Sequence, residues 1–148
     1  MTYSIIILAA GKGTRMGNSA PKVLCKLGKK SLIKHVLDTA KCIQNQSIYL
    51  IVGYEAEKVK EETKDYDLTY VMQHDQLGTG HAVIQVAPYL HDNPVDNILI
   101  LSGDCPLISS ETLNAFIENH TKSGSLGSVL STKLQNPENY GRILRNDT

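Results

Sequence analysis

Cations and glycines gather between residues 9 and 22 of the chain, where they could bind phosphate. Gly11 and Gly13 flank Lys12, and Arg15 and Lys22 follow. Glycines let the backbone come close to a ligand and turn its N–H groups inward, while arginine offers phosphate a planar fork and lysine a point charge. The pattern favours binding of a phosphorylated ligand. An ordinary connecting loop with solvated charges explains the glycine spacing alone equally well.

Two common phosphate loops do not match this run. The dinucleotide fingerprint G-x-G-x-x-G needs its third glycine at position 16, but Gly17 comes one position late. Pro21 also prevents a helix from opening directly after the loop. The P-loop pattern G-x-x-x-x-G-K-[ST] is absent from the sequence. The run therefore predicts a different phosphate loop, with cations of its own.

Asp104 is the carboxylate whose position most favours metal binding. It follows Gly103, just after the apolar run Ile98–Leu101. Magnesium in proteins is usually held by one or two carboxylates together with substrate phosphates. The sequence therefore predicts Asp104 as a metal ligand, and the alternative is an aspartate that caps the following turn.

An alternation of strands and helices must position these residues. The segment Tyr3–Leu8 is apolar and rich in β-branched residues, as a strand buried on both faces should be. Ser31 precedes an amphipathic stripe and is predicted to cap that helix. The expected strands are Tyr3–Leu8, Ile48–Val52, Leu68–Met72, Ile98–Leu101, Gly127–Lys133 and Gly141–Arg145. The expected helices are Leu32–Ala40, Glu55–Glu62, Gly80–Val86 and one capped by Ser109 or Ser110.

Strands separated by helices imply parallel pairing and right-handed crossovers. We therefore expect an α/β fold, a doubly wound, mostly parallel sheet with helices on both faces, similar to a Rossmann domain. In such sheets ligands bind outside the carboxyl ends of the strands. The loops after Leu8 and Leu101 both fall at that edge.

Composition excludes several classes of function. The formal net charge of the 148 residues is zero, whereas a general nucleic-acid binder or a polybasic membrane binder needs a positive excess. The three cysteines form no CxxC pair and the five histidines no HExxH motif, which argues against a disulfide framework and a zinc site. The apolar run Ile5–Ala10 is too short to span a bilayer, and no basic segment precedes it. We expect a cytoplasmic protein with no nucleic-acid or membrane partner.

The glycine run carries a resemblance to a known family. Leu8–Met16, with Pro21 and Lys22 after it, resembles the signature of the sugar nucleotidyltransferases. Many nucleotidyltransferases share this run, so it identifies the family and not the substrate.

Three later segments narrow the resemblance. The run Gln73–Ala82, which contains the letters GTGHA, resembles a stretch of the N-acetylglucosamine-1-phosphate uridyltransferases. The segments Leu101–Leu107 and Asn139–Ile143 are similar to two further motifs of those enzymes. One departure is Ser102, where the relatives often carry an aromatic residue. The four motifs stand in the same order as in the family and cover nearly the whole chain.

The resemblance implies roles for individual residues. The backbone of Ala9 and Ala10 and the side chain of Gln73 would contact uracil, while Arg15 and Lys22 would bind the triphosphate and act in catalysis. Asp104 would bind Mg²⁺, the implied cofactor. The alternatives are that Gln73 is an exposed polar residue and that the two cations are ordinary surface residues. The nucleotide-binding residues implied are Leu8, Ala9, Ala10, Gly11, Gly13, Gln73, Gly78, Thr79, Gly103 and Gly141.

The implied reaction is attack of a sugar 1-phosphate oxygen on the α-phosphorus of UTP, which releases pyrophosphate and forms UDP-N-acetylglucosamine. Because the attacking phosphate oxygen is already ionised, no general base is needed. Catalysis would rest on positioning and charge neutralisation. His81 is expected to orient or pack, and not to act as a base.

The family's catalytic domain continues beyond the position that corresponds to Thr148. We therefore expect residues 1–148 to form a single nucleotidyltransferase-like domain that lacks its C-terminal sugar-binding part. Three hypotheses stay open: a uridylyltransferase or part of one, completed by a second polypeptide or another copy; a non-catalytic protein that binds UTP or a UDP-sugar; and an inactive remnant of a shortened gene. The sugar 1-phosphate is a partner only in the first.

Overall fold

The computed structural model describes residues 1–13, 20–138 and 140–144. It divides into two compact units, Met1–Asn114 and Ala115–Thr148, and each is described by itself. The first unit contains the sheet and the helices that surround it. Arg15, predicted to bind triphosphate, lies outside the described residues.

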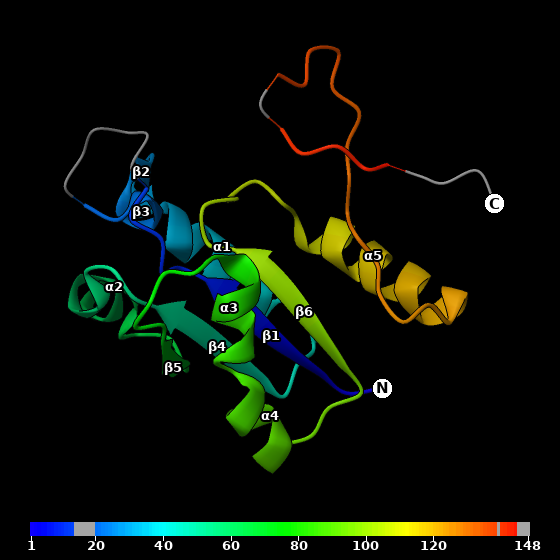
Figure 1. Ribbon diagram of the computed structural model, residues 1–148, viewed down its shortest axis with the longest axis horizontal. Coiled ribbons are helices and arrows are strands. Elements are labelled where there is room, and N and C mark those ends of the chain that lie inside the picture. The colour runs from blue at the N-terminus through cyan, green and yellow to red at the C-terminus, as the bar shows by residue number, and fades with distance from the viewer. Residues whose placement is uncertain (14–19, 139, 145–148) are drawn as a thin grey trace. The chain divides into compact units, whose positions relative to one another are not determined.

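A parallel sheet forms the centre of the first unit (Figure 1). Its strands are β1 (Tyr3–Leu8), β4 (Ser47–Val52), β5 (Thr69–Met72) and β6 (Asn97–Ser102), in the spatial order β5-β4-β1-β6. Every neighbouring pair in this sheet is parallel. This confirms the predicted α/β class, because consecutive parallel strands need crossover connections.

Helices cover both faces of the sheet. In Figure 1, α3 (Thr79–Ile84) and α4 (Ala87–Asp92) lie in front of the strands and α1 (Leu32–Lys41) lies behind them. The remaining elements are α2 (Ala56–Thr63), α5 (Ser110–Ser123), the 3₁₀ helix η2 (Lys22–Leu24) and the small antiparallel pair β2 (Lys26–Leu27) and β3 (Lys30–Ser31). The doubly wound arrangement is the one that the sequence predicts.

The core follows from alternation along the strands. Ile6 of β1 packs with Tyr49 and Ile51 of β4 in a buried cluster that also contains Ala82 and Val86. Ile5 and Ile7 point to the opposite face of the sheet and are fully buried there. A central parallel strand covered on both faces is apolar throughout for this reason. On α1, the predicted apolar stripe is buried, and its members are Ile33, Val36, Leu37 and Ala40.

The carboxyl ends of β1 and β6 meet at a switch point of the topology. The chain winds from β1 to β4 on one side, and β6 pairs with the other side of β1. Leu8 and Ser102 are in register, and the Gly103 N–H donates to the Leu8 carbonyl (3.0 Å). In open α/β sheets the crevice at such a point is the usual ligand site.

The backbone at position 103 lies so close to β1 and α1 that only a glycine fits there. A Cβ at this residue would lie 2.8 Å from the Leu8 carbonyl oxygen and 3.0 Å from Ile33 Cδ1. Only glycine lets the chain turn here without displacing β1 or α1. Asp104 follows directly, so the tight turn sets the position of its carboxylate.

Two predicted strands are corrected. Residues 127–133 and 141–144 form no strand, and Arg145 lies outside the described residues. Val129 and Leu130 are exposed within the first of these segments. An alternating pattern gives a strand only where a neighbour completes the hydrogen-bond ladder. Neither segment has a ladder partner among the residues described.

Two details of the helices also differ from expectation. The predicted helix Gly80–Val86 is confirmed as α3, but α3 ends at Ile84, and a further helix, α4, follows it with Pro88 in its first turn. Proline fits a first turn because its missing N–H would be unpaired there anyway. Ser31 is the N-cap residue of α1 by position, but its hydroxyl donates to Glu62 (2.8 Å) and makes no cap bond.

No helix in the described part of the chain has the length and apolar character needed to cross a membrane.

Candidate functional site

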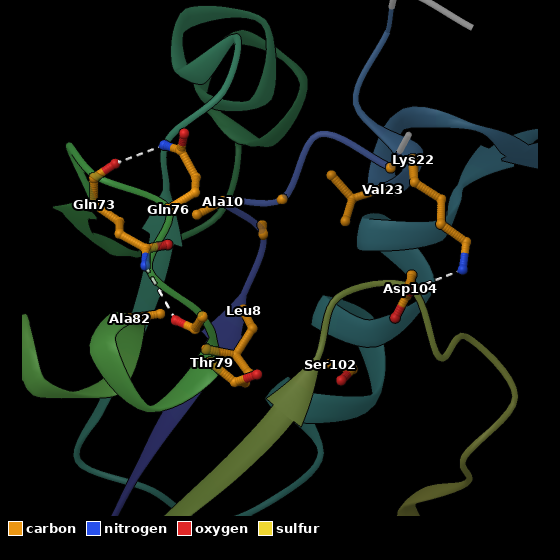
Figure 2. Close-up of a pocket in the computed structure, with 14 residues that line it drawn as sticks. Leu8, Ala10, Lys22, Val23, Gln73, Gln76, Thr79, Ala82, Ser102 and Asp104 are labelled. Carbon is orange, nitrogen blue, oxygen red and sulfur yellow. Dashed lines mark hydrogen bonds and ion pairs between the residues drawn. The ribbon is translucent and has the colours of Figure 1, made fainter. Parts of the chain in front are cut away.

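A cavity of about 430 Å³ opens at the carboxyl edge of the sheet (Figure 2). Its volume falls within the range typical of small-molecule sites. It lies at the switch point between β1 and β6, with α3 on one side and η2 on the other. The lining residues are Leu8, Ala9, Ala10, Gly11, Gly13, Lys22, Val23, Gln73, Gln76, Gly78, Thr79, Ala82, Ser102 and Asp104.

The first wall is the loop that follows β1. The Ala9 N–H donates to the Ile51 carbonyl (2.9 Å), and the Ala10 carbonyl accepts from the Tyr54 N–H (3.2 Å). These bonds hold the backbone in place, while the small side chains keep space free beside it. Gly13 adopts a φ of +63°, a conformation that favours glycine. The described loop is therefore anchored to the sheet and open toward the cavity.

Lys22 and Asp104 meet at the second wall. Lys22 begins η2, directly after Pro21, and Asp104 follows β6 and Gly103. Lys22 Nζ lies 2.7 Å from Asp104 Oδ2, and both side chains are partly exposed. Figure 2 shows the two side chains pointing toward one another. The residues predicted to bind phosphate and metal thus occupy one place, from distant parts of the chain.

Cys105 adds a third group beside this ion pair. Its thiol donates to Asp104 Oδ1, with sulfur and oxygen 3.7 Å apart. Burial, together with the neighbouring Asp104 charge, raises the pKa of the Cys105 thiol. At neutral pH the thiol therefore stays protonated and acts as a weak donor to the carboxylate, and not as a nucleophile.

Gln73 forms the third wall, just after β5. Its backbone N–H donates to the Val52 carbonyl (2.8 Å), which continues the ladder by one bond. Its side chain is 3% exposed, and Nε2 donates to the Gly78 carbonyl (3.2 Å) and lies 3.1 Å from His81 Nδ1. Gln73 is thus a buried amide held in one place, and not the exposed polar residue of the alternative interpretation.

The cavity brings together most of the predicted residues. Gly103 does not line the cavity, but its N–H donates to the carbonyl of Leu8, which does line it. Gly141 belongs to the second unit, and Arg15 lies outside the described residues. The predicted residues that line the cavity are Leu8, Ala9, Ala10, Gly11, Gly13, Lys22, Gln73, Gly78, Thr79 and Asp104.

Sequence reasoning missed four lining residues: Val23, Gln76, Ala82 and Ser102. Three of them had a usable signal, and one of the three is Ala82, the last residue of the Gln73–Ala82 run. Gln76 lies inside the Gln73–Ala82 run, and its Nε2 donates to the Gln73 carbonyl (3.2 Å). Ser102 is the last residue of β6, opposite Leu8, so the strand register alone places it at the ligand edge.

The donor set at the cavity suits a hard divalent cation that keeps substrate and water ligands. Asp104 is the one acidic residue among the lining residues, and its Oδ2 already faces a cation, the Lys22 ammonium. Among the residues described, no group of three or more His, Cys, Asp or Glu could enclose a metal. Magnesium fits such a site, since it commonly uses one or two carboxylates plus phosphate oxygens and water.

The fold and cavity define a nucleotidyltransferase-type α/β domain. The model of one family, the MobA-like NTP transferase domain, matches residues 5–143. The chain belongs to this family.

Several solved structures share the fold. A nucleotidyl transferase from Methanothermobacter thermautotrophicus is 22% identical, with a TM-score of 0.64 over 79% of this chain and 57% of its own. The CMP:2-keto-3-deoxy-manno-octonic acid synthetase complexed with CTP is 19% identical (TM-score 0.65; 85% of this chain and 50% of its own). Rv0371c from Mycobacterium tuberculosis H37Rv, complexed with manganese, is 23% identical, with a TM-score of 0.62 over 80% of this chain and 59% of its own. The chain thus spans about half to three-fifths of these structures.

Proposed function

We propose that the cavity binds UTP with Mg²⁺, as the nucleotide site of a transfer of UMP to N-acetylglucosamine 1-phosphate. One observation carries the proposal: a glycine loop, a lysine, a carboxylate and a buried amide from separate parts of the chain line the same cavity. These are the groups that a nucleoside triphosphate requires for its phosphates, its metal and its base.

The phosphates would lie between the loop after β1 and η2. Gly11 and Gly13 line this side and would offer their backbone N–H groups to the phosphates, and Lys22 supplies a positive charge there. Charge neutralisation by fixed donors stabilises the transition state of phosphoryl transfer. Arg15 would add a second cation, as the sequence predicts.

The metal would be held by Asp104 and by phosphate oxygens. Bound there, Mg²⁺ would neutralise charge on the phosphates and orient them. The neighbour in complex with manganese is consistent with a divalent metal in proteins of this fold.

The base would lie against Gln73. An amide can donate and accept, so it can read the edge of a pyrimidine. The GTGHA run that follows favours uracil, through its resemblance to the uridyltransferases. The neighbour in complex with CTP binds another pyrimidine nucleotide.

A protein that binds nucleotide without transferring it is the second candidate. Asp104 is the one acidic residue among the lining residues, whereas transfer also needs groups that hold the acceptor in line with the α-phosphorus. We propose that these groups, and those for the sugar, lie outside the described cavity.

Two measurements separate these candidates. Calorimetry with UTP, CTP and ATP, each with and without Mg²⁺, tests binding and base preference. Pyrophosphate release from UTP and N-acetylglucosamine 1-phosphate tests transfer. Binding with release supports the uridylyltransferase, and binding without release supports the second candidate. Equal affinity for all three nucleotides would contradict the uridine assignment.

A further inference from the structure

The side chain of Gln73 is held by two acceptors from the segment that follows it. Its Nε2 carries two N–H groups, and the Gly78 carbonyl oxygen and His81 Nδ1 lie 3.2 and 3.1 Å away. All hydrogen bonds of this side chain within the described residues use Nε2. Oε1 is therefore the atom that Gln73 offers to the cavity. In Figure 2 a dashed line marks the hydrogen bond that the amide nitrogen of Gln73 donates, and the amide oxygen points away from that line.

His81 can serve as this acceptor in only one of its neutral forms. A neutral imidazole has one N–H and one bare nitrogen. Gln85 Nε2 lies 3.2 Å from His81 Nε2, so the ring has an amide nitrogen beside each of its own nitrogens and can accept from only one. Gln73 is buried and Gln85 is half-buried, so an unpaired N–H costs more on Gln73. The favoured tautomer of His81 therefore has a bare Nδ1, which accepts from Gln73, and its N–H on Nε2.

We propose that His81 is a positioning residue that fixes the orientation of the Gln73 amide, and through it the base selectivity of the cavity. The inference rests on the proposed function, because it takes Gln73 to be the group that faces the base. His81 lies on α3, and the Gly78 carbonyl is the N-cap carbonyl of the same helix, where it also accepts from the Ala82 N–H (3.1 Å), so α3 holds both acceptors of the Gln73 amide.

The orientation matters because the two ends of an amide select opposite partners. An oxygen in the cavity accepts from a ring N–H such as that of uracil N3, whereas an N–H there donates to the bare N3 of cytosine. Turning the amide would place Oε1 against both the Gly78 oxygen and His81 Nδ1. Without the His81 acceptor, the turned amide meets only one unfavourable contact. Discrimination between uracil and cytosine should then weaken.

The test compares UTP and CTP, which carry the same phosphates, by calorimetry with Mg²⁺. His81→Phe keeps a ring but removes the acceptor, and it should reduce the UTP-to-CTP affinity ratio roughly three- to tenfold, the worth of one hydrogen bond. His81→Asn places a carboxamide oxygen near the position of Nδ1 and should largely restore the ratio. His91→Phe, the same change at an exposed histidine of α4, is the control and should leave the ratio unchanged.

A second measurement uses the unmodified protein and does not depend on whether a variant folds. Long-range ¹H–¹⁵N correlation spectra of the imidazole distinguish the two neutral tautomers. We expect the N–H of His81 on Nε2, and a proton on Nδ1 would overturn the proposal.

The outcomes separate this inference from the proposed function. A folded His81→Phe variant that keeps the UTP preference of the unmodified chain overturns the positioning role and leaves the uridine assignment intact. A lower UTP-to-CTP affinity ratio in His81→Phe, together with recovery of the ratio in His81→Asn, supports the positioning role of His81. Equal binding of UTP and CTP by the unmodified chain overturns the uridine assignment and this inference together.

Discussion

The ammonium of Lys22 lies 2.7 Å from the carboxylate of Asp104, although 82 residues separate them in the sequence. The pairing neutralises two charges at the mouth of the cavity. Both side chains are partly exposed, and ion pairs of this kind contribute at most about 1 kcal/mol to stability. The pair is therefore easily opened, as the proposed binding of a metal to the carboxylate and of phosphate to the ammonium would require.

Asp104→Asn should weaken metal-dependent nucleotide binding while leaving the fold intact. The amide is nearly isosteric but carries no charge, so it binds Mg²⁺ poorly. Because the ion pair is partly exposed, thermal unfolding should shift little. Calorimetry with UTP, with and without Mg²⁺, measures the effect. Asp92→Asn, at an exposed site of α4, is the control, and an unchanged Mg²⁺ dependence in the Asp104 variant would make that residue only a turn cap.

Lys22→Ala should cost more affinity for UTP than for uridine. The lysine is proposed to contact phosphate, and losing a hydrogen bond to a charged group costs roughly 1.5–3 kcal/mol. Calorimetry with both ligands gives the difference directly. Lys64→Ala, on the exposed surface after α2, should change neither affinity. If the Lys22 variant loses affinity equally for UTP and uridine, Lys22 does not bind the phosphates.

The ionised Glu62 carboxylate should stabilise the folded chain, and this contribution should be lost at acid pH. The Ser31 hydroxyl bond lowers the pKa of Glu62; partial burial opposes this, and Lys34 adds to it. The pKa of Glu62 is lower in the folded chain than in the unfolded chain. The stabilising contribution of Glu62 is therefore fully present above its ordinary pKa of 4.5, and it is lost as the pH falls from that value through the lower pKa of the folded chain.

Urea unfolding of the unmodified chain and of Glu62→Gln measures this contribution. The variant should be less stable at pH 7, and the difference should shrink at pH 3. A difference in unfolding free energy that is the same at both pH values would exclude this linkage.

Much of the fold can be predicted because its signals are local. The apolar run from Ile5 to Ile7 indicates a strand covered on both faces, and the stripe on Leu32–Ala40 indicates the buried face of a helix. The segment Gly127–Lys133 shows the limit. Its pattern suits a strand, but a strand also needs a neighbour, and that depends on the rest of the chain.

The site was partly predictable for the same reason. The glycine run and Asp104 each follow a predicted strand, and the carboxyl ends of parallel strands share one edge. The pairing of Lys22 with Asp104 could not be predicted, because it requires β6 to lie beside β1. Nor could the link between Gln73 and His81, which depends on how α3 packs against the end of β5.

Gly103→Ala should destabilise the chain and disturb the site together. The new Cβ would lie 2.8 Å from the Leu8 carbonyl oxygen and 3.0 Å from Ile33 Cδ1, so β1, α1 or the turn must move. Overpacking of this kind costs roughly 1–3 kcal/mol. Urea unfolding measures the cost, and weaker UTP binding should accompany it because Asp104 follows the turn.

Gly80→Ala is the matched control for this substitution. Gly80 lies in α3, and a Cβ there would meet no atom within 4 Å. Alanine is the better helix former by about 1 kcal/mol, so this variant should be as stable as the unmodified chain or more stable. Of the two glycine substitutions, only Gly103→Ala should therefore lower the stability of the chain. If Gly103→Ala keeps both its stability and its affinity for UTP, close packing between β1, α1 and the turn does not position Asp104.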